Sequence, residues 1–239
     1  MVEKRIITDF VVLGKAVPSE IRDGRVTVCT AGYSEELGLV RLYPTNYRSP
    51  LKRWNIVEVP VERDAQDSRS ESWKIQGSKR EWTQLHKKID VVGKLARNSG
   101  YKLVEDLVDD CVFDINDERR SLGVVKPIIK ECYFQEESNY DSTIQRTLFG
   151  EFKPTTKRQY PEFPKIKYRC SGCRTKTYHD QQVLEWGFYE WMRKNPENIE
   201  QVWENVGIFS DDKEIFFLVG NQRNQRTSFM IISVLRFKV

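Results

Sequence analysis

The feature that most constrains the fold is a cysteine and histidine motif near the middle of the C-terminal half. Cys170 and Cys173 are two residues apart, with Gly172 between them, and His179 follows. Two cysteines at this spacing can reach one metal ion from a tight turn, which the backbone freedom of Gly172 favours. A structural zinc ion needs four soft or borderline ligands. The motif supplies three, so the fourth ligand is Asp180, a residue elsewhere in the chain, or absent.

Length and composition predict a folded protein outside the membrane. The 239 residues suffice for one large domain or two small ones, and 39% of them are hydrophobic. No apolar run approaches the roughly 18 residues of a membrane span, and the N-terminus does not read as a signal peptide. Five dispersed cysteines do not form a disulfide framework, and a Cys-x2-Cys pair in a reducing compartment favours metal or redox chemistry. We therefore expect a cytoplasmic protein.

Alternating apolar residues predict a β-rich N-terminal domain, a small antiparallel sheet or a barrel. Two helices are expected after it. The first starts at the capping box of Ser78 and Glu81 and runs to about Ala96, and the second covers residues 102–111, which would place Cys111 in the core. The expected strands cover residues 3–13, 25–30, 39–43, 55–63 and 124–134.

The C-terminal domain is expected to be α+β, with the zinc knuckle at its start. Asp180 is a good N-cap for a helix of about 15 residues. Trp186 lies on the arc of that helix opposite the apolar residues, so a nucleic-acid base or the N-terminal domain must cover it. A second helix opens at Pro196, and two long strands end the chain at 214–219 and 228–237. The predicted boundaries are 1–150 for the first domain, 151–164 for a basic, proline-containing linker and 165–239 for the second domain.

Positive charge is concentrated near the motif, although the net charge is only +4. Residues 152–178 hold eight Lys or Arg and a single acid, whereas residues 105–118 hold seven acids and no base. A basic stretch beside a knuckle is typical of phosphate contact, and Asn, Gln and Arg in the 220–227 loop are side chains that read base edges. Both segments are equally compatible with a solvated linker and a polar hairpin tip. The predicted nucleic-acid contacts are Lys165, Lys167, Arg169, Arg174, Lys176, Trp186, Tyr189, Arg193, Asn221, Gln222, Arg223 and Arg226.

Several sequence blocks resemble a widespread family of uncharacterised prokaryotic proteins. The blocks are Cys29-Thr30-Ala31-Gly32, the Gly-Leu-Val-Arg-Leu-Tyr-Pro run from Gly38 to Pro44, the knuckle followed by Glu185-Trp186, and Phe217-x-Val219-Gly220-Asn221-Gln222. The resemblance implies a grouping and no activity. It pairs Cys29 with the knuckle, and so implies Cys29 as the fourth metal ligand. Gly187 stands where that family has a second acid after the tryptophan, so a role of that acid does not carry over.

The function expected first is binding of DNA or RNA by a protein with a structural zinc site. A metal-dependent nuclease is the enzyme alternative, since Glu151-Phe152-Lys153 has the E-x-K form and Asp141 lies upstream. Cys29 as a nucleophile with His179 as its base is a second catalytic alternative.

A protein-interaction subunit of a larger complex is the third class, with the Trp186 face and the acidic stretch 105–118 as its contact surface. The sequence lacks the zinc deaminase pattern, a P-loop and a Rossmann glycine pattern, which argues against a deaminase, a nucleotide-driven motor and a dehydrogenase.

Overall fold

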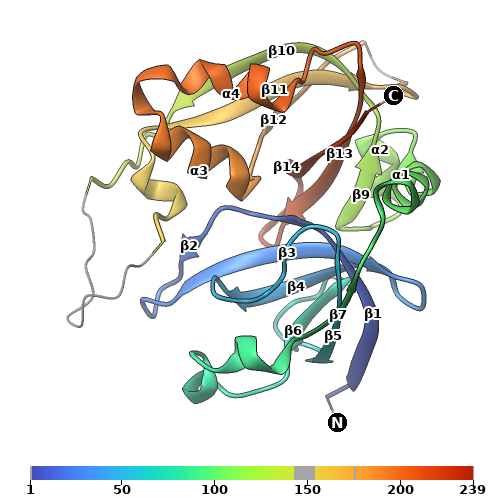
Figure 1. Ribbon diagram of the computed structural model, residues 1–239, viewed down its shortest axis with the longest axis vertical. Coiled ribbons are helices and arrows are strands. Elements are labelled where there is room, and N and C mark those ends of the chain that lie inside the picture. Colours follow the sequence, from blue (N-terminus) through green and yellow to red (C-terminus); the bar gives the residue numbers. More distant parts are fainter. Residues whose placement is uncertain (1, 143–153, 175, 239) are drawn as a thin grey trace.

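The first part of the chain closes into a five-stranded barrel (Figure 1). The computed structural model describes residues 2–142, 154–174 and 176–238. The sheet order is β1-β3-β4-β6-β5, and β5 also pairs with β1, so the sheet returns to its first strand. Only β4 and β6 run parallel, and the other barrel pairs are antiparallel. The barrel strands are β1 (Lys4–Lys15), β3 (Val26–Ser34), β4 (Gly38–Asn46), β5 (Asn55–Glu62) and β6 (Ser72–Ile75).

Period-two alternation explains why these segments form the barrel. In β5, Val57, Val59 and Val61 are fully buried, and the residues between them are partly exposed. Phe10 from β1 fills the same core, and Gly32 in β3 leaves room for its ring, because a Cβ at position 32 would lie 2.6 Å from that ring. The barrel alternative predicted from the sequence is confirmed, as are the four strands expected within it.

The two helices expected after the barrel are wrong in their boundaries. The capping box of Ser78 and Glu81 is present, but it closes only the single turn η1 (Lys79–Glu81), and η2 (Leu85–Lys88) follows. The chain then forms β7 (Asp90–Lys94), because the edge of β5 offers ladder hydrogen bonds to this segment. Helix α1 (Arg97–Asp106) begins where the first helix was expected to stop.

Among the described residues, two sheets, three short α-helices and two 3₁₀ helices form the C-terminal part. The four-stranded sheet has the order β14-β13-β9-β8, and the three-stranded sheet has the order β10-β11-β12. The terminal hairpin predicted from the sequence is confirmed, with β13 paired to β14 along its length. The elements are β8 (Val108–Asp109), α2 (Val112–Asp117), β9 (Leu122–Val125), β10 (Pro127–Glu136), η3 (Lys157–Gln159), β11 (Glu162–Cys170), β12 (His179–Gln182), α3 (Trp186–Lys194), η4 (Pro196–Gln201), α4 (Val202–Val206), β13 (Lys213–Gln222) and β14 (Gln225–Lys238).

The helix expected from Asp180 begins later. Residues His179–Gln182 pair with β11 as a strand, and α3 starts at Trp186 after its N-cap residue Glu185. Strand pairing also shifts the expected domain boundary. Strand β9 pairs with β13 and β10 pairs with β11, so residues 108–136 belong with the C-terminal sheets and not with the expected domain 1–150. The chain is thus β-rich with short helices, and no helix in the described ranges is long and apolar enough to cross a membrane.

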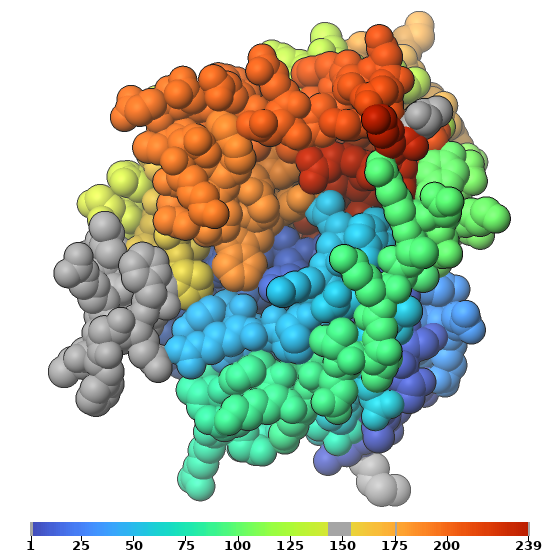
Figure 2. Space-filling view, viewed as in Figure 1, coloured from blue at the N-terminus to red at the C-terminus, as the bar shows by residue number. Residues whose placement is uncertain are grey.

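The barrel and the C-terminal part share a polar junction. Figure 2 shows the orange and red C-terminal residues resting on the blue and cyan barrel. The Val17 backbone N–H donates to the Leu184 carbonyl at 2.7 Å. Arg53 from the barrel forms an ion pair of 2.7 Å with the buried Glu185, whose carboxylate also accepts the Val234 N–H at 2.7 Å. Each half therefore satisfies polar groups of the other half.

Candidate metal centre and candidate binding pocket

Four side chains with metal-binding donors meet in the C-terminal part: Cys111, Cys170, Cys173 and His179. Their donor atoms all lie within 4.8 Å of one another. The Cys173 Sγ is 3.4 Å from the Cys111 Sγ and 3.2 Å from the His179 Nε2. A tetrahedral zinc ion holds sulfur at about 2.3 Å and nitrogen at about 2.0 Å, which separates neighbouring donors by roughly 3.5–3.8 Å. The donor types and their spacing are therefore compatible with one four-coordinate metal ion.

Local structure brings these donors together from three segments. Cys170 ends β11, and Cys173 lies in the turn that follows, where its Sγ accepts the Cys170 N–H at 3.0 Å. His179 opens β12 opposite Tyr168, and the two rings lie 5.2 Å apart. Cys111 is the N-cap residue of α2, which lies between β8 and β9 in the chain.

Gly172 has a role that differs from the turn flexibility expected from the sequence. Its N–H donates to the Asp110 carbonyl at 3.2 Å. A Cβ at position 172 would lie 2.8 Å from the Asp110 Cβ, which is closer than real Cβ atoms come. The glycine is thus needed for close approach, and the segment that it approaches carries Cys111.

Burial shapes the protonation of the cluster. It raises the pKa of the Cys111 and Cys170 thiols and lowers the pKa of the His179 imidazole. The neutral imidazole is the form that binds a metal, whereas the thiols must lose their protons when the ion enters. Metal binding at this site would therefore release protons.

Cys29 does not join the cluster. It lies half-buried in β3 of the barrel, and Cys111 stands in the position that the resemblance implied for it. The His179 Nε2 faces the thiols of Cys111 and Cys173, so the structure does not bring Cys29 and His179 together as a nucleophile and base. No sequence signal distinguished Cys111, because its apolar neighbours match the periodicity of a helix core.

The basic stretch is largely engaged in ion pairs. The pairs have N–O distances of 3.1 Å and join Lys165 to Asp180, Lys167 to Glu131 and Arg174 to Asp114. Arg193 pairs with Glu190 at 2.9 Å, Arg169 also has interactions, and Lys176 is exposed. Exposed pairs of this kind contribute about 0–1 kcal/mol, so a phosphate group can compete for these cations.

The two aromatic residues predicted on the polar face of the helix differ in exposure. Trp186 is half-buried, and the Lys15 Nζ of the barrel lies 4.8 Å from its ring centroid, which agrees with cover by the N-terminal part. Tyr189 is fully buried against Tyr160, at 4.9 Å between ring centroids, and its hydroxyl accepts a hydrogen bond from Gln182 at 2.9 Å. Tyr189 is therefore a core residue and not a nucleic-acid contact.

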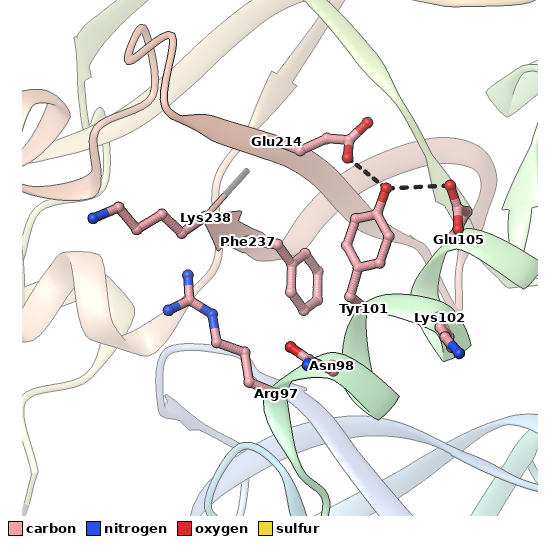
Figure 3. Close-up of a pocket in the computed structure, with 8 residues that line it drawn as sticks. All are labelled: Arg97, Asn98, Tyr101, Lys102, Glu105, Glu214, Phe237 and Lys238. Atoms are coloured by element: carbon pink, nitrogen blue, oxygen red, sulfur yellow. Dashed lines mark hydrogen bonds between the residues drawn. The ribbon is translucent and has the colours of Figure 1, made fainter.

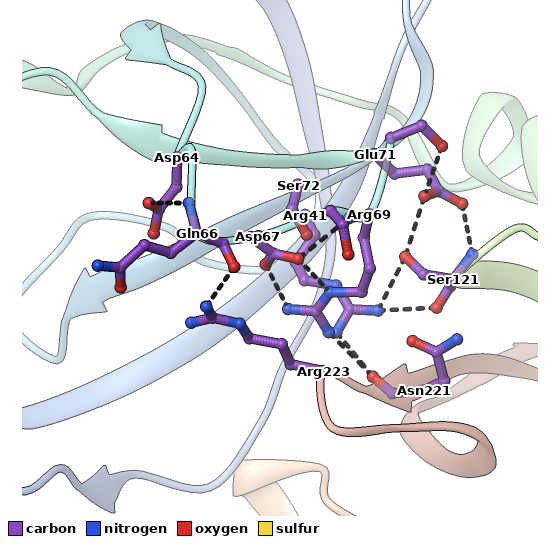
Figure 4. Close-up of polar contacts among 12 residues, drawn as sticks. Arg41, Asp64, Gln66, Asp67, Arg69, Glu71, Ser72, Ser121, Asn221 and Arg223 are labelled. Carbon is purple, nitrogen blue, oxygen red and sulfur yellow. Dashed lines mark hydrogen bonds and ion pairs between the residues drawn. The ribbon is translucent and has the colours of Figure 1, made fainter.

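The 220–227 loop docks on the barrel loop 63–71 (Figure 4). Asn221 is buried, and its main-chain oxygen accepts hydrogen bonds from Arg41 and Arg69 at 3.1 Å. Arg223 donates to the Gln66 carbonyl, and Arg226 donates to the Ser68 hydroxyl at 2.6 Å. The loop is thus one side of a contact between the two halves.

A cavity of about 490 Å³ lies where this loop meets the barrel. We call it the junction pocket. Among the described residues, its lining includes four cationic side chains and no acidic one; the cations are Arg41, Arg69, Lys157 and Arg223. Neutral and apolar residues complete it, among them Thr27, Cys29, Tyr43, Leu184, Gln222, Met230 and Ile232.

Arg41 is the most deeply buried cation of the junction pocket, with 4% of its surface exposed. Its guanidinium donates to the main-chain oxygens of Ser121 at 2.7 Å and Asn221 at 3.1 Å. No carboxylate of the described residues forms an ion pair with it, whereas Arg69 pairs with Asp67 at 2.6 Å. Burial lowers the pKa of Arg41, which reflects the cost of holding a charge away from water.

A second cavity, of about 440 Å³, lies at the opposite end of the β13–β14 hairpin (Figure 3). The Tyr101 hydroxyl lies between Glu214, at 2.7 Å, and Glu105, at 3.2 Å. These hydrogen bonds, with Glu214 first, raise the pKa of Tyr101. Acidic and basic side chains are mixed in this cavity, so its charge favours no class of ligand.

Two family models together cover most of the chain. One, described as "Domain of unknown function (DUF8758)", matches residues 7–104, and the other, "Domain of unknown function (DUF8757)", matches residues 111–238. The gap between the two matches coincides with the point at which strand pairing passes from the barrel to the C-terminal sheets. No curated protein matches the chain.

Proposed function

The chain belongs to the DUF8757 family, and for it we propose a nucleic-acid-binding function in which a structural zinc ion shapes the C-terminal part. The barrel and the junction pocket supply the binding face. The metal centre holds together the segments that support it.

The observation that carries this proposal is the position of the junction pocket on the barrel. Counted along the chain, the five barrel strands follow the order 1-2-3-5-4 and return to 1, the Greek-key arrangement of an OB-fold. OB-fold barrels bind oligonucleotides over strands 2 and 3 and the loops 1–2 and 4–5. Here these are β3, β4, residues 16–25 and residues 63–71. They contribute Ser19, Thr27, Cys29, Arg41, Tyr43 and Arg69 to the pocket lining.

The donor set of the metal centre supports a structural role for zinc. Four protein ligands fill a tetrahedral ion and leave no position for a substrate or a reactive water molecule. Zinc would hold Cys111 of the 108–117 segment against the turn between β11 and β12. Strand β9, which follows that segment, pairs with β13, which leads into the 220–227 loop.

The other functions have less support from the described residues. Glu151-Phe152-Lys153 of the nuclease alternative lies outside them. The acidic stretch of the protein-interaction alternative is partly used within the chain, since Asp109 pairs with Arg120 at 2.5 Å and Asp114 with Arg174 at 3.1 Å.

The test is a titration of labelled oligonucleotides of about 12 nucleotides, as single-stranded DNA, single-stranded RNA and duplex, at several salt concentrations. We expect the affinity to fall with salt, with a slope of about −0.7 for each phosphate neutralised on a single strand. Arg226→Ala should reduce that slope. Arg97→Ala, at the opposite end of the hairpin, is the matched control. An affinity that stays constant between about 50 and 200 mM salt would contradict the proposal.

A further inference from the structure

The junction pocket differs from an open OB-fold groove because the C-terminal part closes one side of it. The tip of the β13–β14 hairpin, with Asn221 to Asn224, lies opposite β3 and β4, and Lys157 borders the same cavity. An open groove accommodates a run of extended strand, whereas this cavity has a volume of about 490 Å³. That volume lies in the lower half of the about 300–1,000 Å³ typical of small-ligand sites. The space therefore suits one nucleotide and not several.

The charge of the pocket points to an anionic group. Arg41, Lys157 and Arg223 all lack a carboxylate partner within hydrogen-bonding distance among the described residues, and their recorded hydrogen bonds go to neutral oxygens. The Lys157 Nζ donates to the Gln182 Oε1 at 2.8 Å, and Arg223 donates to a main-chain carbonyl. The carboxylates that act on Arg41 and Lys157 are Glu71, Asp67 and Glu137, and none of them is among the described residues that line the cavity. A negative group that enters the cavity would therefore be attracted by all three cations.

A purely structural role explains only part of this arrangement. The two carbonyls that Arg41 reaches belong to the C-terminal part, so Arg41 does hold the halves together. A neutral donor could make the same two hydrogen bonds without the cost of burying a charge. The structural role extends to Arg223, which donates to the Gln66 carbonyl of the barrel, but it does not account for Lys157. Lys157 lines the cavity, and its Nζ bonds to Gln182 of its own half of the protein.

We propose that the junction pocket binds one phosphorylated nucleotide. In this proposal Lys157 and Arg223 contact the phosphate. Arg41 and Arg69 add positive charge from the barrel side of the cavity. The base lies against Tyr43, Leu184 and Ile232. This inference rests on the proposed function, because it specifies which part of a nucleic acid enters the protein: a single unpaired nucleotide. The same chemistry is available in a free nucleoside monophosphate, so the test separates the two sources.

The experiment combines calorimetric titration of the four nucleoside 5′-monophosphates with their competition against a labelled single strand. The unphosphorylated nucleosides and inorganic phosphate serve as partial ligands. We expect at least one monophosphate to bind about tenfold more tightly than its nucleoside, since a charge-assisted contact is worth that factor or more. Lys157→Ala and Arg223→Ala should each weaken monophosphate binding by about tenfold.

The matched control is Arg97→Ala, an exposed arginine on α1 near the opposite end of the hairpin. Strand β13 spans 10 residues, so the two ends are separated by about 30 Å. This variant should bind monophosphates as the unchanged protein does. Equal affinity for nucleoside and monophosphate, or unchanged binding in both Lys157→Ala and Arg223→Ala, would overturn the pocket assignment.

The two proposals fail in different ways. If single strands bind with a steep salt dependence but no monophosphate binds or competes, the protein binds nucleic acid elsewhere and the pocket assignment is wrong. If monophosphates bind and no strand binds at low salt, the pocket assignment holds for free nucleotides and the nucleic-acid-binding function is wrong. Displacement of a bound strand by a monophosphate supports both.

Discussion

The metal centre and the junction between the two halves both join distant segments, but they are completed in different ways. In the metal centre the donors face each other, with the Cys111 and Cys173 sulfurs 3.4 Å apart. In the junction the side chains reach groups of the other half: Arg53 pairs with the Glu185 carboxylate at 2.7 Å, and Glu71 accepts hydrogen bonds from the Ser121 N–H at 2.6 Å and from the Ser121 hydroxyl at 3.0 Å. These junction contacts are therefore made between groups of the chain itself. The donors of the metal centre could instead be joined by a bound metal ion.

The largest effect is expected from removing a metal ligand. Cys111→Ser should abolish binding of one equivalent of zinc, whereas Cys29→Ser should retain it, since Cys29 lies in the barrel. Structural zinc contributes about 10–16 kcal/mol of apparent binding free energy in small zinc domains, so loss of the ion should lower the melting temperature strongly. Elemental analysis with thermal unfolding, with and without a chelator, measures both quantities. Zinc retained by Cys111→Ser, or lost from Cys29→Ser, would show that the ligand set is wrong.

Breaking a junction contact should reduce the stability less than removing a metal ligand does, and the reduction should not depend on bound metal. Glu185→Ala leaves Arg53 without its carboxylate and the Val234 N–H without its acceptor, which should destabilise the fold by about 3–5 kcal/mol. Glu190→Ala, which removes the exposed partner of Arg193, is the control and should cost about 1 kcal/mol or less. Urea unfolding gives both values. The stability difference between the unchanged protein and Glu185→Ala should be the same with and without chelator. If most of this difference disappears when both proteins are treated with chelator, the two regions are coupled and the contrast between them fails.

Two glycines allow the regions to be perturbed separately. In Gly172→Ala the new Cβ would meet Asp110, so we expect weaker zinc binding because Cys111 is pushed away. In Gly220→Ala the new Cβ would lie 2.5 Å from the Ile232 Cδ1 and 3.0 Å from an Arg41 nitrogen. We expect a loss of about 1–3 kcal/mol with unchanged zinc affinity. A competition titration with a zinc chelator tests this, and a reversed pattern would contradict the assignment of the two glycines.

The smallest effect concerns pH at the junction. Burial, and then the nearby Lys52, lowers the pKa of Lys15 to about 8 from an ordinary value of 10.5. Between these values the unfolded chain binds more protons at Lys15 than the folded chain does, so its contribution to stability rises with pH through this window. The free energy of unfolding of the unchanged protein should therefore rise relative to that of Lys15→Met as the pH increases from about 8 to 10.5. Unfolding curves of both proteins over this pH range measure the difference. A stability difference that stays constant over this window would show that Lys15 titrates normally.

Strand periodicity predicted the barrel well, because alternation is a local property of each strand. The helix boundaries were missed where tertiary partners decided the outcome: residues 90–94 joined the edge of β5, and His179–Gln182 joined β11. Three ligands of the metal centre could be predicted because they lie within ten residues of one another. Cys111 could not, since it lies 59 residues before Cys170 in the chain and reaches the cluster through tertiary contacts such as that of Asp110 with Gly172.

The junction pocket was missed for a related reason. The 220–227 loop was recognised as rich in Arg, Asn and Gln, but Arg41 lies 180 residues before Asn221 in the chain. Long-range packing of the barrel against the hairpin creates the cavity, and no local pattern reports it.

The hydrogen bonds across the junction have a consequence for dividing the protein. A break between residues 104 and 111, in the gap between the two family matches, would separate Arg41 and Arg69 from the carbonyl of Asn221, and Glu71 from Ser121. In each fragment made by itself, polar and charged groups that are buried at the junction of the whole protein would be exposed without their partners, and the fragment would precipitate. Made in the same cell, the fragments would present matching polar faces and reassemble.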